Sequence, residues 1–205
     1  MAASALERGV TVLLERIGTC LWGFSPRMIT PVVARLGPIR ALAWFISNLP
    51  RYQRTLTAIG PIRLHLLCTA ISLVNGCLYC THGQAYALEL AYLREKGRLF
   101  PLDAHAIGLL CGMPPGLIRH RMVTALEQAG LPAEIRWLER AIALAIAEDP
   151  SPTDDDDVRI SHLVRMLAML TSIGVDDSGT EADQALSPLN KDKALKERYA
   201  QMRAG

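Results

Sequence analysis

Apolar residues recur three and four positions apart along almost the whole chain, and this spacing limits the fold more than any other feature. In the runs Leu6–Ile17, Leu117–Leu126 and Ile160–Leu170, the apolar side chains would share one face of a helix. Breakers such as Gly60-Pro61 lie between the runs, and a proline in a first helical turn costs nothing because its missing N–H would have no partner there. No segment alternates with the period of two that a half-buried strand shows. The sequence therefore predicts an all-α fold of about eight or nine helices and no sheet.

The length fits one domain with a peripheral extension. A chain of 205 residues is long enough to bury a core without disulfide staples. Near the end the character changes, because a polar break at Asp176–Thr180 precedes a charged, weakly amphipathic helix predicted over Pro188–Arg203. We expect a single all-α domain over residues 1–175, with its core at about 59–175, and a C-terminal extension over 176–205. This extension would pack loosely or against another subunit.

The composition bears on partners. Half of the residues are hydrophobic and the mean hydropathy is +0.19, which is high for a soluble monomer. Long apolar helices that also bury a subunit interface would explain it, so we expect a homo-oligomer. The 22 basic and 20 acidic residues give a net charge of +2, which is too balanced to indicate nucleic acid or an anionic membrane as a partner. Aromatic residues make up only 5%, which argues against base-stacking surfaces.

The cysteines and the apolar stretches bear on localisation. Five cysteines are an odd number in a chain of ordinary size, unlike a secreted disulfide scaffold. The first residues lack the basic-then-apolar order of a signal peptide. The longest apolar stretches, near Leu64–Val74 and Ala141–Ala147, are too short to span a bilayer. We expect a cytoplasmic protein, and in a reducing cytoplasm a Cys-x-x-Cys pair is more often catalytic or metal-binding than structural.

Two thiols three residues apart form the densest group of reactive side chains, in the run Asn75-Gly76-Cys77-Leu78-Tyr79-Cys80. Such a pair can close a small disulfide and so transfer two electrons. The pattern predicts one buried helix over Ile62–Val74, a break at the Asn-Gly pair, and a second helix from about Cys77 to Lys96. In the first turn of that helix, free N–H groups and the positive end of the macrodipole favour a thiolate.

Three polar side chains near the pair are candidates for its chemistry. Gln84 follows Cys80 by four residues and shares its helix face. His82 follows Cys80 by two residues and points elsewhere. His65 lies on the preceding helix and would approach Cys80 if the two helices run back on each other.

This segment resembles the alkylhydroperoxidase D-like family, also called the carboxymuconolactone decarboxylase-like family. Its redox-active members carry Glu, eleven residues, Cys, two residues, Cys, three residues and His. Cys77 and Cys80 match the two cysteines, whereas His65 stands at the glutamate position and Gln84 at the histidine position. The resemblance covers residues 59–97 well. It implies the family's all-α helical bundle, here with extra helices at both ends, and the oligomeric assembly that is usual in the family.

The resemblance implies a thiol-dependent hydroperoxidase or disulfide oxidoreductase. In the family, the glutamate and histidine relay a proton from the second cysteine, which attacks a hydroperoxide, and the first cysteine resolves the sulfenic acid. Carried over, Cys80 attacks, Cys77 resolves, His65 acts as the base and Gln84 orients it. A dithiol reductant, such as a lipoyl or thioredoxin-like protein, would restore the thiols. No cofactor and no metal is implied.

The two departures from the family pattern can be interpreted in two ways. A histidine with a pKa near neutrality is a suitable base for a thiol, so His65 could replace the glutamate. Alternatively the relay is broken, because Gln84 cannot carry a proton by ionising, and loss of a general base typically costs roughly 100- to 10,000-fold in rate. Further candidates for the pocket are Cys68, three residues after His65, together with Tyr79 and His82.

Other interpretations stay open. Cys77, Cys80, His65 and His82 could form a zinc site, although structural zinc usually takes two ligand pairs and no second pair exists; the cysteines could also be ordinary buried thiols. Lyase or isomerase chemistry on a small carboxylated or lactone substrate is an alternative, but that branch of the family generally lacks the cysteine pair. A third possibility is a non-enzymatic oligomeric protein with a decayed relay. The acidic run Asp154–Asp157 is predicted to begin a helix, where carboxylates favour the dipole.

Overall fold

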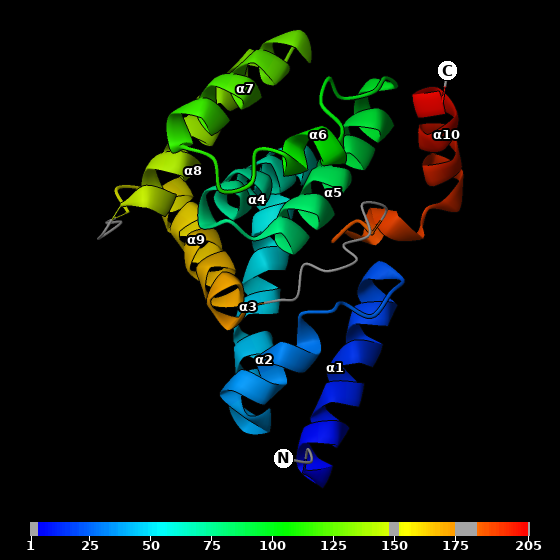
Figure 1. Cartoon of the computed structure of the whole chain (residues 1–205), viewed down its shortest axis with the longest axis vertical. Helices are drawn as coiled ribbons and strands as arrows, with labels where there is room; N and C mark the ends of the chain where they lie inside the picture. Colours follow the sequence, from blue (N-terminus) through cyan, green and yellow to red (C-terminus); the bar gives the residue numbers. More distant parts are fainter. Residues whose placement is uncertain (1–3, 148–151, 175–183, 205) are drawn as a thin grey trace.

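The computed structural model describes residues 4–147, 152–174 and 184–204 of the chain. Within these residues all regular structure is helical, with ten α-helices, two short 3-10 helices and no strand (Figure 1). This confirms the all-α prediction, with slightly more helices than expected. The helices are α1 Ala5–Trp22, α2 Ile29–Leu36, α3 Pro38–Ile59, α4 Pro61–Asn75, α5 Leu78–Lys96, α6 Ala104–Gly108, α7 Pro115–Gln128, α8 Ile135–Ile146, α9 Asp155–Ile173 and α10 Lys193–Ala204, with 3-10 helices η1 Pro132–Glu134 and η2 Pro188–Lys191.

Helices α4 and α5 form the centre of the bundle. Every residue from Leu64 to Leu73 of α4 and from Tyr79 to Leu93 of α5 is buried. A helix that is buried all round needs neighbours on every side. Besides each other, α4 contacts α3, α7, α8 and α9, and α5 contacts α6 and α10 (Figure 1). None of the described helices is long and apolar enough to cross a membrane.

The turn between α4 and α5 follows from two residues. Gly76 has φ +75°, in the left-handed region that favours glycine, and it ends α4. Cys77 is the N-cap of α5, and its sulfur accepts the backbone N–H of Cys80 at 3.3 Å. The helices predicted over Ile62–Val74 and from about Cys77 to Lys96 therefore agree with α4 and α5 to within one residue at each end.

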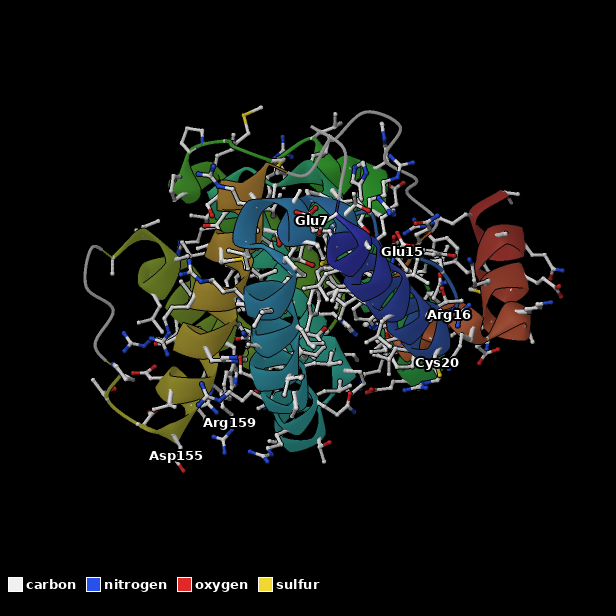
Figure 2. All side chains as sticks on the ribbon, turned by 90° about the horizontal axis from the view of Figure 1, so that it is seen from below. Glu7, Glu15, Arg16, Cys20, Asp155 and Arg159 are labelled. Atoms are coloured by element: carbon white, nitrogen blue, oxygen red, sulfur yellow. A yellow bond between two sulfur atoms is a disulfide. The ribbon has the colours of Figure 1, made fainter. Side chains whose placement is uncertain are left out.

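Helices α1, α2 and α3 form a layer beside this centre. The long helix α3 contacts α1 and α2 as well as α4 and α9. Figure 2 shows the molecule from below, with Glu7, Glu15, Arg16 and Cys20 labelled on α1 and Asp155 labelled at the start of α9. The predicted acidic helix start is confirmed, because Asp154 caps α9 by accepting the backbone N–H of Asp157 at 2.8 Å. Side chains of α3 reach the start of α5, because Asn48 and Tyr52 of α3 line a common cavity with Cys80.

The C-terminal segment returns to the central helices. The charged helix predicted over Pro188–Arg203 is present as η2 and α10, whereas the polar break at 176–180 and the expected boundary at 175–176 lie outside the described residues. Helix α10 packs on α5, where the buried Glu89 carboxylate accepts hydrogen bonds from Tyr199 Oη at 2.7 Å and from the Arg203 guanidinium. The Ala104 N–H also donates to Glu89, at 2.7 Å. This buried ion pair ties the end of the chain to the helix that carries the cysteine pair.

Candidate functional site

The cysteine pair lies at the start of α5. The Cα atoms of Cys77 and Cys80 are 5.4 Å apart and the two sulfur atoms lie within disulfide-bonding distance. Both residues are buried, with exposed fractions of 5% and 1%. The free N–H groups of the first turn and the helix macrodipole favour negative charge at this point. The arrangement can therefore support a thiolate and can close a disulfide without rearranging the backbone.

A small cavity lies against one cysteine of the pair. Cys80 and Gln84, one turn apart on α5, both line it, whereas Cys77 does not. Its volume of about 50 Å³ compares with the roughly 10–15 Å³ that one water needs on the same measure, so it has room for a few waters or for the reacting end of a small molecule. We call this space the Cys80 cavity. Its apolar wall consists of Trp22, Met28, Trp44, Phe45, Leu49, Met166, Leu167, Leu170 and Leu186, and its polar lining of Asn48, Tyr52 and Gln84.

The C-terminal segment supplies part of that wall. The N–H of Leu186 donates to the Gly83 carbonyl at 3.0 Å, and the Leu186 side chain lies directly on Gly83. A Cβ at position 83 would approach Leu186 Cγ to 2.7 Å, which real Cβ atoms do not show, so glycine is needed for this close contact. The extension thus reaches the cavity beside Gln84.

His65 hydrogen-bonds Gln84, and no hydrogen bond joins it to Cys80. Its Nδ1 lies 2.8 Å from Gln84 Oε1, a carbonyl oxygen that can only accept, so Nδ1 carries the proton and Nε2 the lone pair. Nε2 is buried and has no hydrogen-bond partner among the described residues. Burial lowers the pKa of His65 to about 4, and the hydrogen bond to Gln84 opposes this shift only in part. At neutral pH the ring is therefore uncharged.

His65 lines a second space, which we call the His65 cavity. It has a volume of about 270 Å³ and adjoins the Cys80 cavity, because Trp22, Leu49, Tyr52 and Leu186 line both. Helices α4 and α5 do run back on each other. However, Gln84 lines the Cys80 cavity, whereas His65 lines the His65 cavity and not the Cys80 cavity. Of the four residues expected to act together, the structure thus groups Cys77 with Cys80, Cys80 with Gln84, and Gln84 with His65.

Tyr52 on α3 is a site residue that the sequence did not indicate. Tyr52 lines both cavities, and its buried hydroxyl meets hydrogen-bond geometry with no group among the described residues. Burial raises the pKa of Tyr52 well above its ordinary value, and nearby Cys68 adds to this rise. The neighbouring Gln84 amide offsets part of the rise in pKa, although its position does not meet hydrogen-bond geometry. Nothing in the spacing of residues around position 52 marks it, because only the packing of α3 on α4 brings it to the site.

The remaining candidates lie around this group. Cys68 is buried, and burial raises the pKa of its thiol far above the ordinary value, so it stays protonated. Tyr79 accepts the backbone N–H of Arg27 at 3.2 Å, and burial is the main reason that its pKa rises to about 12. His82 packs against Gly108 of α6. None of these three side chains lines the Cys80 cavity.

Metal binding was a second interpretation of the cysteines. In the part of the chain that the structure describes, no three His, Cys, Asp or Glu side chains come close enough together to hold a metal ion.

Comparisons with known proteins add nothing to this geometry. The chain has no significant match to a model of a known protein family, to a curated protein or to a solved structure.

Proposed function

We propose that this protein is a thiol-dependent reductase of organic hydroperoxides, in which Cys80 attacks the peroxide and Cys77 resolves the product. The observation that carries the proposal is that Cys80, and not Cys77, lines an apolar cavity, while the two sulfur atoms lie within bonding distance of each other. The resemblance of residues 59–97 to the alkylhydroperoxidase D-like bundle points to the same roles.

The reaction balances with these two residues and a hydroperoxide. The Cys80 thiolate attacks the terminal oxygen, the O–O bond breaks, and the sulfur is oxidised to a sulfenic acid while the alkoxide leaves and is protonated to an alcohol. The Cys77 sulfur then attacks the Cys80 sulfur, water leaves, and a disulfide forms. A dithiol reductant, such as a lipoyl or thioredoxin-like protein, returns two electrons and two protons by thiol–disulfide exchange.

His65 and Gln84 support this chemistry by position in our proposal. The Gln84 amide lines the cavity and is available to hydrogen-bond the peroxide, and His65 holds the amide oxygen at 2.8 Å. A neutral ring that hydrogen-bonds Gln84 and has a pKa near 4 is poorly suited to act as the direct base for the thiol. The macrodipole at the start of α5 favours negative charge at the thiol pair, and the Cys80 N–H donates to Cys77 Sγ at 3.3 Å.

One experiment tests the proposal directly. The reduced protein is treated with one equivalent of tert-butyl hydroperoxide and its cysteines are mapped by mass spectrometry. We expect a Cys77–Cys80 disulfide in the wild type, no disulfide in Cys80→Ser, and in Cys77→Ser a Cys80 sulfenic acid that dimedone traps. Cys20→Ser is the matched control, because Cys20 is an exposed thiol on α1, and it should leave the disulfide yield unchanged (Figure 2).

If both thiols of the pair stay reduced under these conditions, the proposal is wrong. That outcome would favour the non-enzymatic interpretation, in which the bundle persists without peroxide chemistry. An oxidation that is confined to Cys20 would have the same meaning.

We also propose that the protein is a homo-oligomer. Large apolar side chains remain exposed on the N-terminal helices, where a second subunit would cover them. Sedimentation velocity on the wild type should show a species larger than 22.5 kDa, and a charged substitution within this set should reduce it. The exposed side chains on α1 and α3 are Leu6, Val12, Leu13, Ile17, Ile39 and Ile46.

A further inference from the structure

The peroxide reaction needs a proton at the oxygen that leaves. An alkoxide is a strong base, so O–O cleavage is faster when a positioned acid protonates the oxygen as the bond breaks. Gln84 cannot supply this proton by ionising. Of the described side chains that line the Cys80 cavity, Tyr52 is the one besides Cys80 that can release a proton.

The hydroxyl of Tyr52 has no structural task in the described part of the chain. It is buried and meets hydrogen-bond geometry with no described group, although the Gln84 amide lies near enough to act on it. A buried polar group left unsatisfied costs about 1–3 kcal/mol, so phenylalanine would serve better if the ring only filled space. A buried hydroxyl without a hydrogen-bond partner, on a residue that lines the same cavity as Cys80, indicates a group that is free to bond a ligand.

We propose that Tyr52 is a catalytic residue that donates its hydroxyl proton to the leaving alkoxide oxygen of the hydroperoxide. This role rests on the proposed function. The Cys80 thiolate takes the terminal OH of the peroxide, the O–O electron pair goes to the alkoxide oxygen, and the Tyr52 proton converts that oxygen to an alcohol. The phenolate then takes up a proton from solvent. This proton replaces the one that the Cys80 thiol released to solvent when it became a thiolate, so protons and electrons balance.

The surroundings of Tyr52 suit this transfer. Burial keeps the hydroxyl protonated at rest, because it disfavours the phenolate. An alkoxide remains the stronger base, so the transfer is still downhill. The Gln84 amide beside the hydroxyl stabilises the transient negative charge, because it lowers the pKa of Tyr52.

The test compares two oxidants with different leaving groups. tert-Butyl hydroperoxide releases a strongly basic alkoxide that needs the proton, whereas peracetic acid releases acetate, which does not. We measure the rate of Cys80 oxidation by stopped flow for the wild type and for Tyr52→Phe. The variant should lose roughly 100-fold or more with tert-butyl hydroperoxide and should stay within a few-fold of the wild type with peracetic acid.

A control and a second measurement keep the result interpretable. Tyr92→Phe removes the hydroxyl of another buried tyrosine, which donates to the Ala129 carbonyl at 2.8 Å, and it should change neither rate. In D2O, the wild type should slow more with tert-butyl hydroperoxide than with peracetic acid, and this measurement needs no variant to fold.

Equal losses with both oxidants, or no loss with either, would overturn the role of Tyr52. The same holds if the solvent isotope effect is equal for the two oxidants. A wild-type protein that stays reduced with both oxidants would instead refute the proposed function, and the role of Tyr52 would fall with it.

Discussion

Acidification from pH 7 to pH 4 should weaken the fold through a single buried side chain, His65. The ring is 1% exposed, and burial is the main reason that its pKa falls from 6.5 to about 4. The unfolded chain binds a proton at this histidine near pH 6.5, whereas the folded chain does not until about pH 4. His65 therefore does not weaken the folded state above pH 6.5, and the free energy of unfolding decreases as the pH falls from 6.5 toward 4.

The size of the effect follows from the shift. A change from 6.5 to about 4 is about 2.5 pKa units, and each unit corresponds to about 1.4 kcal/mol. At pH 4 the protonated unfolded state thus gains about 3 kcal/mol over the folded state through this group. A loss of about 3 kcal/mol changes the folding equilibrium roughly a hundredfold. It is a large part of the free energy of unfolding of about 5–15 kcal/mol that is typical for a domain.

The assay is guanidinium unfolding of the wild type and of His65→Gln at pH 7, 6, 5 and 4. Glutamine keeps a polar group that can still bond Gln84 but does not titrate. Other groups, such as His162 and Asp157, titrate equally in both proteins and cancel in the difference. The free energy of unfolding of the wild type minus that of the variant should fall by about 3 kcal/mol between pH 7 and pH 4.

Two results would refute this reasoning. The first is a difference between the two proteins that stays constant or grows as the pH falls. The second is a proton NMR titration of the His65 ring with a pKa at or above 6.5, which would mean that the site accepts the charged ring.

Three further perturbations test the packing around the site. Gly83→Ala should cost about 1–3 kcal/mol of unfolding free energy in a thermal or chemical melt, because the new Cβ meets Leu186. The double variant with Leu186→Ala should lose less than the sum of the two single losses, and additive losses would contradict the contact. Arg203→Met should cost roughly 3–5 kcal/mol at pH 8, because it leaves the Glu89 carboxylate buried without its cation. The loss should be smaller at pH 5, since burial already raises the pKa of Glu89 and a protonated carboxyl carries no charge, so equal losses at both pH values would speak against the ion pair. Asp154→Ala should cost about 1 kcal/mol by removing the N-cap of α9, with Asp154→Ser nearly unchanged, and an unaltered melt for Asp154→Ala would rule out the cap.

The helices around the cysteines were predictable because their limits depend on local chemistry. Pro61 at a first helical turn and Gly76 in the left-handed region define α4, and each acts through its own backbone geometry. The same is true of Asp154, whose side chain caps the helix that begins next to it. Helical spacing also placed Gln84 on the face of Cys80, and both do line one cavity.

The environment of the side chains was not predictable in the same way. The sequence places His65 on the helix before the cysteine pair, but the pKa of His65 depends on complete burial, to which the five helices that contact α4 contribute together. An exposed histidine would have kept a pKa suited to a base. The sequence shows the ring and its place on the helix, but not the medium around it.

By itself, then, the sequence determined the all-α architecture, the turn that sets the thiol pair at a helix start, and the shared face of Cys80 and Gln84. These are short-range properties, because hydrogen bonds and caps within a helix involve residues a few positions apart. Only the tertiary structure decided which thiol meets a cavity, that Tyr52 lies on its wall, and that Leu186 closes it over Gly83. Such contacts join residues about 30 to 100 positions apart, and they arise from the packing of apolar faces, which local periodicity does not specify.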